Sequence, residues 1–101
     1  MTDDDILLKP KRKTRTERPR LYKVILLNDD FTPRDFVIAV LQAIFRMTED
    51  EAFMVMLAAH RHGACVVAVY TREVAETKAE QGTEAGRSRG YPLAFTTERE
   101  T

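Results

Sequence analysis

The stretch of sequence that decides the fold is YKVILLNDDFTPRDFVIAVL, residues 22–41. Its first part, Tyr22–Asn28, is rich in β-branched and aliphatic residues and stops at a polar Asn-Asp-Asp cluster, which is typical of a strand that runs into a turn. Thr32 then predicts a helix cap, with Pro33 in the first helical position and Asp35 as the capping-box acid. Apolar residues follow at helical spacing and predict one buried face: Phe36, Val37, Val40, Leu41, Ile44 and Phe45.

A second helix and a second strand are predicted downstream of this stretch. Thr48 and Glu51 repeat the capping-box pattern, and Gly63 is a suitable residue to end the helix. This helix carries Phe53, Met54, Met56, Leu57 and His60. The next segment, Cys65–Tyr70, is a continuous apolar run, which predicts a central strand that is buried on both faces.

The end of the chain predicts a third helix and a third strand. The helix begins at about Arg72 and is expected to end before Gly86 or Gly90, and Pro92–Thr97 forms the last strand. The inner side of this helix is expected to carry Val74, Ala75 and Ala79. The predicted order is therefore β-α-α-β-α-β, an α+β fold in which helices cover a three-stranded, mainly antiparallel sheet.

Length and composition favour one small soluble domain. The chain has 101 residues, of which 44% are hydrophobic, and no apolar run approaches the roughly 20 residues of a membrane span. The N-terminus lacks the apolar core of a secretory signal. Cys65 is the only cysteine, which excludes an internal disulfide and a cysteine-based zinc site, and it is expected to be a buried small hydrophobe. A cytoplasmic monomer is expected.

The net charge of zero conceals a basic arm on an acidic body. Residues 1–20 carry seven basic and four acidic side chains, whereas residues 21–101 carry nine basic and twelve acidic ones. The first segment has no hydrophobic periodicity and is predicted to be a flexible extension of a core domain that spans residues 21–101. Nucleic-acid binding by the arm would be steeply salt-dependent. We do not expect it, because the arm has no interleaved aromatic residues.

Catalytic patterns are weak in this sequence. The four glycines do not form a phosphate-binding loop, and Cys65 lies in the middle of a predicted strand. The two histidines, His60 and His62, are two positions apart on a helix and point to different sides. Asp29 and Asp30 are adjacent and do not face each other across a cleft. We expect no catalytic residue, metal or cofactor, although a metal-assisted site built from Asp29, Asp30 and His60 remains an alternative.

One combination of residues fits a ligand. Asn28, Asp29 and Asp30 lie where a strand ends and a helix begins, and Met56, Ala59 and His60 share a face of the second helix. If the turn and this face meet, they form an apolar hole edged by an amide, two carboxylates and an imidazole. Such a hole suits a free amino terminus next to a Leu, Phe, Tyr or Trp side chain. On spacing alone, a polar turn and a structural histidine explain the same residues.

Four blocks of the sequence resemble the ClpS family of Clp protease adaptors. They are the Asn-Asp-Asp-aromatic-Thr-Pro stretch of residues 22–41, then MLAAHRHG, VYTREVAETKA and YPLAFTTE. The blocks occur in the family's order and cover residues 21–98. This resemblance implies a non-enzymatic adaptor of the N-degron pathway, which binds a bulky hydrophobic first residue (Leu, Phe, Tyr or Trp) and delivers the substrate to a Clp AAA+ ATPase–protease. A docking modulator of the ATPase that does not bind N-degrons is the alternative.

The resemblance also implies a role for individual residues. The α-amino group would be held by Asn28, Asp30 and His60, with Asp29 holding the turn or acting through water. The side-chain pocket would be lined by Leu26, Leu27, Thr32, Arg34, Val37, Met56, Ala59 and Leu93. Docking on the N-terminal domain of the ATPase would involve Phe31, Glu73, Glu76 and Lys78. Arg34 and Ala59 replace the family's common Met and Val, so a narrowed or shifted preference among first residues is expected.

Overall fold

A computed structural model of the chain describes residues 18–101. The predicted extension, residues 1–20, lies almost entirely outside the described residues. The elements are β1 (Leu21–Leu27), α2 (Arg34–Phe45), α3 (Glu49–His62), β2 (Ala64–Thr71), α4 (Arg72–Arg87) and β3 (Ala94–Arg99). This order confirms the predicted β-α-α-β-α-β arrangement and the α+β class.

The sheet is antiparallel and has the strand order β2-β1-β3. β1 is the central strand, and its Leu26 is opposite Cys65 on one side and Phe95 on the other. The prediction that β2 is a central, two-sided strand is therefore wrong. A continuous apolar run predicts a strand, but it does not show whether that strand has a neighbouring strand on one side or on both. In β2 the residues Val66 and Val69 are 46% and 38% exposed.

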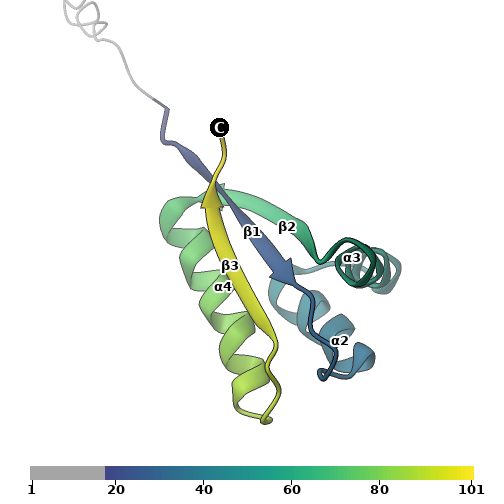
Figure 1. The fold of residues 1–101 in the computed structure, drawn as a ribbon. Coiled ribbons are helices and arrows are strands. Elements are labelled where there is room, and N and C mark those ends of the chain that lie inside the picture. Colours follow the sequence, from purple (N-terminus) through teal and green to yellow (C-terminus); the bar gives the residue numbers. More distant parts are fainter. Residues whose placement is uncertain (1–17) are drawn as a thin grey trace, which may run out of the picture.

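The helices form a layer on one face of the sheet (Figure 1). α4 runs along β3 and β1, α3 lies against β2, and α2 packs on both α3 and α4. The buried core consists of Val24, Leu26, Val37, Val40, Leu41, Phe45, Ala52, Met56, Ala59, Ala75, Ala79, Leu93 and Phe95. Within residues 18–101, no helix has the length and apolar character needed to cross a membrane.

The N-terminal caps of α2 and α3 differ from each other. At α3, the predicted capping box is confirmed, because Thr48 Oγ1 accepts from the Glu51 N–H at 3.1 Å and Glu51 Oε1 accepts from the Thr48 N–H at 2.9 Å. At α2, the prediction that Thr32 is the cap is wrong. Pro33 occupies the cap position and has no side-chain group that could accept a hydrogen bond, and the hydroxyl of Thr32, one residue earlier, donates to the carboxylate of Asp29.

α4 continues through two glycines that sequence patterns treat as stops. It passes Gly82 and Gly86 and ends at Arg87, so of the two predicted stops Gly90 is the one that lies beyond the helix, whereas Gly86 lies within it. A Cβ atom at Gly82 would lie 2.6 Å from the Phe95 ring, and one at Gly86 would lie 2.7 Å from Leu93 Cβ. The glycines therefore let the helix approach β3 and the segment before it closely.

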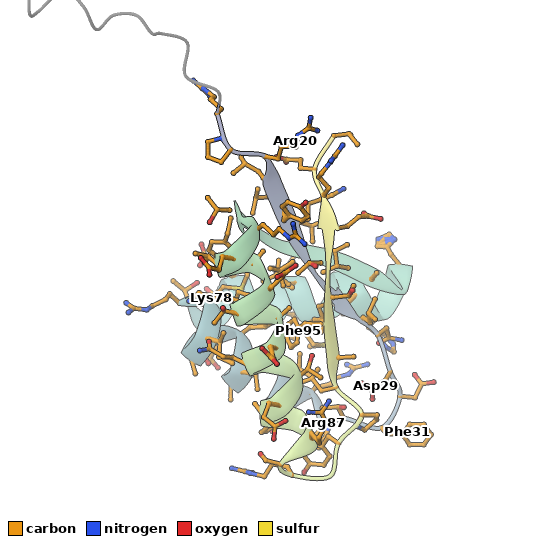
Figure 2. The ribbon with its side chains drawn as sticks, turned by 90° about the vertical axis from the view of Figure 1, so that its left-hand side faces the viewer. Arg20, Asp29, Phe31, Lys78, Arg87 and Phe95 are labelled. Atoms are coloured by element: carbon orange, nitrogen blue, oxygen red, sulfur yellow. The ribbon has the colours of Figure 1, made fainter. Side chains whose placement is uncertain are left out.

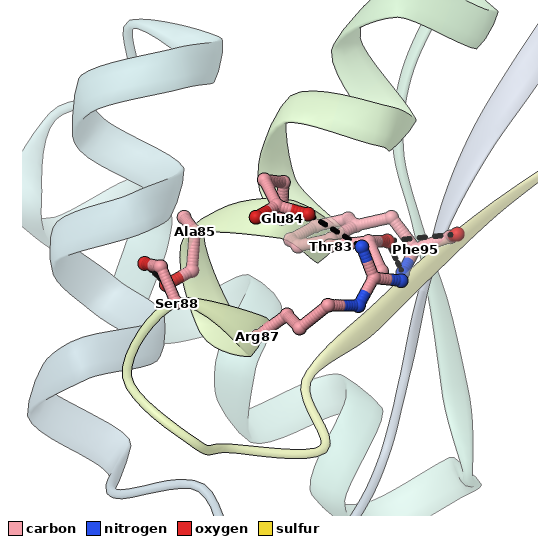
Figure 3. Close-up of polar contacts among 6 residues, drawn as sticks. All are labelled: Thr83, Glu84, Ala85, Arg87, Ser88 and Phe95. Carbon is pink, nitrogen blue, oxygen red and sulfur yellow. Dashed lines mark hydrogen bonds and ion pairs between the residues drawn. The ribbon is translucent and has the colours of Figure 1, made fainter.

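A hydroxyl group also joins α4 to β3. Thr83 Oγ1 accepts from the Phe95 N–H at 3.0 Å and lies 3.3 Å from the Phe95 carbonyl oxygen, to which it donates (Figure 3). On the inner side of α4, Ala75 and Ala79 are buried as predicted, but Val74 is 43% exposed. β3 begins at Ala94, two residues later than predicted, and Leu93 is buried before it.

Candidate functional site

A cavity of about 320 Å³ opens beside the C-terminal end of β1, and its volume is at the small end of the range of ligand pockets, about 300–1,000 Å³. Its walls come from β1, the turn after it, α2, α3 and the segment before β3. The lining residues are Leu26, Leu27, Asn28, Asp29, Asp30, Phe31, Thr32, Pro33, Arg34, Val37, Met56, Ala59, His60 and Leu93. The structure thus brings together every residue that was predicted to hold the amine or to line the pocket.

The floor of the cavity is apolar and belongs to the protein core. Five lining side chains from four different segments are at most 7% exposed: Leu26, Val37, Met56, Ala59 and Leu93. Met56 and Ala59 are three positions apart on α3 and therefore share one face of it. An apolar group that enters the cavity meets this floor and loses contact with water, which is favourable.

The turn between β1 and α2 is organised by the carboxylate of Asp29. Its Oδ1 accepts from the backbone N–H groups of Phe31 at 2.8 Å and Thr32 at 2.7 Å. Its Oδ2 accepts from the Thr32 hydroxyl at 2.9 Å. An aspartate that bonds to the backbone two and three residues later fixes the turn locally. The Asp29 carboxylate is therefore engaged within the turn.

The next residue, Asp30, differs from Asp29 in its surroundings. Asp30 is exposed, and its carboxylate takes part in none of the hydrogen bonds and ion pairs found among residues 18–101. It also lines the cavity. Asp30 is thus the carboxylate at the cavity rim that is available to a ligand.

Asn28 and His60 come together because of a backbone hydrogen bond at Gly63. The N–H of Asn28 donates to the Gly63 carbonyl oxygen at 3.0 Å. Gly63 is the C-cap of α3, has φ of 90°, and donates its own N–H to the Ala59 carbonyl oxygen at 2.8 Å. The end of β1 is thereby held against the last turn of α3, where His60 is located. Sequence patterns identified Gly63 only as a helix stop.

The residues predicted to dock on an ATPase are divided between two places. Phe31 is 80% exposed and lines the cavity, and Figure 2 shows it at the turn next to Asp29. Lys78 lies well away from Phe31 in the same view, on α4. Glu73 and Glu76 are also on α4 and are exposed. The structure therefore does not bring Phe31 together with the other three.

Lys78 has a structural contact of its own. Its ammonium donates to the Ile44 carbonyl oxygen at 2.8 Å, at the C-terminal end of α2, and lies 5.9 Å from the centre of the Tyr70 ring. Cations are favourable at helix C-termini, where backbone carbonyls lack partners. Lys78 thus fastens α4 to α2.

Cys65 and the histidine, aspartate and glutamate side chains are the remaining groups with reactive or metal-binding chemistry. Cys65 is half-buried, and this burial raises the pKa of its thiol, which disfavours the nucleophilic thiolate. Across residues 18–101, no three His, Cys, Asp or Glu side chains are close enough together to hold a metal ion.

Residues 17–96 match the family model described as ATP-dependent Clp protease adaptor protein ClpS. The chain belongs to the ClpS family. Two named relatives are ATP-dependent Clp protease adapter protein ClpS 1 of Bradyrhizobium diazoefficiens and ClpS 2 of Agrobacterium fabrum. The first is 64% identical and covers 96% of this chain and 98% of the relative, and the second is 56% identical and covers 99% of both.

A solved ClpS structure shares the fold. Agrobacterium tumefaciens ClpS2 bound to L-phenylalaninamide superposes with a TM-score of 0.81 at 59% sequence identity. The match covers 82% of this chain and 100% of that chain. The family and the α+β architecture that the sequence predicted are therefore both confirmed.

Proposed function

We propose that this ClpS-family chain binds substrate proteins by a bulky hydrophobic first residue and delivers them to a Clp AAA+ ATPase–protease. The observation that carries the proposal is one cavity with a buried apolar floor and the polar residues Asn28, Asp30 and His60 at its rim. The ligand of the Agrobacterium relative, L-phenylalaninamide, combines an α-amine with an aromatic side chain. Those are the two groups that such a cavity would accept.

The rim and the floor contribute to affinity in different ways. The α-ammonium donates to the Asn28 carbonyl, the Asp30 carboxylate and the His60 imidazole, and each charge-assisted bond contributes about 1.5–3 kcal/mol. Burial of a Leu or Phe side chain on the floor adds roughly 1.5–3 kcal/mol. Together they support an affinity near −8 kcal/mol, which is roughly micromolar. Internal residues are rejected because only the first residue has a free amine.

The remaining cavity residues shape the site. Asp29 acts through the turn, since its oxygens are already engaged there. The side-chain pocket is formed by Leu26, Leu27, Thr32, Arg34, Val37, Met56, Ala59 and Leu93. Arg34 and Ala59, which both line the cavity, would set the preference among Leu, Phe, Tyr and Trp, since the apolar stem of an arginine can pack over a first side chain and alanine is a small residue.

Delivery requires a second surface, for which α4 is the candidate. Glu73 and Glu76 are exposed there and present negative charge to the N-terminal domain of the ATPase, and Lys78 lies half-buried on the same helix with its ammonium held by the Ile44 carbonyl oxygen. Phe31 would extend this contact only if the partner also reaches the cavity rim. The N-terminal extension is the segment that the ATPase engages during transfer. In this scheme the chain is a cytoplasmic monomer and has no catalytic role.

The proposal is tested by a series of peptides that differ only in the first residue. Peptides that begin with Leu, Phe, Tyr or Trp are expected to bind at micromolar concentrations, and peptides that begin with Ala, Lys or Glu to bind at least about ten-fold more weakly. Fluorescence anisotropy of labelled peptides measures this ranking. No binding of any of the peptides would favour the alternative of a docking modulator that does not bind N-degrons, and equal binding of all of them would contradict selection by the first residue.

A further inference from the structure

Arg34 is a positively charged residue that does not stabilise the helix in which it lies, α2. It is the first residue of α2 and lines the cavity, and its side chain is exposed. It takes part in none of the ion pairs found among residues 18–101, which join Lys23 to Glu98, Arg72 to Glu76 and Arg87 to Glu84. A positive charge in the first turn of a helix is unfavourable because it faces the positive end of the helix dipole. Helix stability therefore gives no reason for an arginine here.

Arg34 differs in charge from the other ionisable residues that line the cavity. Asp29 is engaged in the turn, and Asp30 is the available carboxylate. Among the residues that line the cavity within the described part of the chain, Arg34 carries the one permanent positive charge. The rim thus offers the Asp30 carboxylate to a substrate ammonium and the Arg34 guanidinium to an anionic group of the ligand.

A bound peptide supplies a candidate partner for this cation. When the first side chain fills the cavity and its amine contacts Asn28 and Asp30, the second residue leaves across the cavity rim. A guanidinium binds carboxylates in a planar, bidentate geometry, and the long stem of arginine lets its head follow a ligand outside the cavity.

We propose that Arg34 binds the side-chain carboxylate of the substrate's second residue. A bulky first residue followed by Asp or Glu is then preferred over one followed by Lys or Arg. This inference rests on the proposed function of the cavity. Without Arg34, the rim would carry the negative charges of Asp29 and Asp30 and would repel an acidic second residue. Removing Arg34 should therefore reverse the preference and not merely weaken it.

The test uses three peptides that begin Phe-Glu, Phe-Gln and Phe-Lys and are otherwise identical. The full chain is expected to bind Phe-Glu about three-fold more tightly than Phe-Lys at 0.05 M salt. The difference should be smaller at 0.5 M salt, where the Debye length is roughly one-third of its value at 0.05 M. Arg34→Met should bind Phe-Lys more tightly than Phe-Glu.

A matched control is available at the far end of the sheet. Arg99 is exposed and lies opposite Tyr22 in the sheet, whereas the cavity lies beyond Leu27 at the other end of β1. Arg99→Met removes the same charge and should keep the wild-type order of affinities. Thermal unfolding of both variants verifies that they are folded.

The possible outcomes distinguish a failure of this inference from a failure of the proposed function on which it rests. Equal binding of Phe-Glu and Phe-Lys by the wild type, or an unchanged preference in Arg34→Met, overturns the role of Arg34. In either case, binding of Phe-Gln still supports the proposed function. If Phe-Gln does not bind at all, both proposals are overturned.

Discussion

The backbone N–H of Asn28 donates to the carbonyl oxygen of Gly63 at 3.0 Å, which joins the end of β1 to the C-terminus of α3. This bond holds the Asn-Asp-Asp turn beside the helix that carries Met56 and His60. The geometry of the cavity therefore depends on a glycine that does not line it.

Replacing Gly63 by alanine should weaken both the fold and peptide binding. Gly63 has φ of 90°, and a Cβ atom there would meet nothing within 4 Å, so the cost comes from backbone strain alone. The left-handed conformation costs a non-glycine residue roughly 1–2 kcal/mol. Gly63→Asn should lose less, because Asn tolerates this conformation better. Urea unfolding measures the loss, and wild-type stability of Gly63→Ala would contradict the account.

The two aspartates should respond differently to substitution. Asp29→Ala removes three hydrogen bonds that hold the turn and should lower the free energy of unfolding by about 1–3 kcal/mol, with weaker peptide binding as a consequence. Asp30→Ala should leave stability unchanged and weaken binding by about ten-fold, since one charge-assisted bond is lost. Urea unfolding and peptide titration of both variants measure the split. Equal losses of stability would show that the two carboxylates have the same role.

Gly86→Ala should destabilise the protein although alanine normally stabilises a helix. In an ordinary helix the change from Gly to Ala gains roughly 0.5–1 kcal/mol. Here the new Cβ would lie 2.7 Å from Leu93 Cβ, which is held by the backbone, and overpacking costs typically about 1–3 kcal/mol. Leu93 lines the cavity, so peptide affinity should fall too. Gln81→Ala, at an exposed position of the same helix, is the control. A more stable Gly86→Ala protein would disprove the close contact.

Stability should decline at alkaline pH. Burial raises the pKa of the Cys65 thiol and that of the Tyr70 phenol above their ordinary values. The folded state therefore favours the neutral forms, and the unfolded chain loses these protons first as the pH rises. Stability is retained at neutral pH and falls as the pH rises through the range in which thiols and then phenols of the unfolded chain lose their protons. Urea unfolding at a series of pH values measures this, and Cys65→Ala should reduce the early part of the decline. A flat profile would contradict it.

Much of the fold was predictable because local signals and tertiary structure agree. The capping box of Thr48 and Glu51, the glycine stop at Gly63 and the apolar face of α2 are all found as predicted. The cavity residues were predictable in part because the turn directly follows a strand that packs against the helices.

The remaining features depend on contacts between distant segments. Thr32 belongs to the turn and not to the helix cap, because the Asp29 carboxylate accepts from both its N–H and its hydroxyl. Gly86 lies inside α4 and does not mark its end, and Leu93 occupies the space where a side chain at this position would lie. The edge position of β2 is set by the pairing of β1 with β3, which no property of β2 reveals.

The central claim is that the cavity holds a charged amino terminus together with an apolar side chain, and acetylation of one peptide tests it most directly. A peptide that begins with Phe should bind at micromolar concentrations, and its N-acetylated twin should bind at least about 100-fold more weakly, because it lacks the charge and the donors that Asn28, Asp30 and His60 accept. Isothermal titration of the two peptides under identical conditions gives the ratio. Equal affinities would contradict the account.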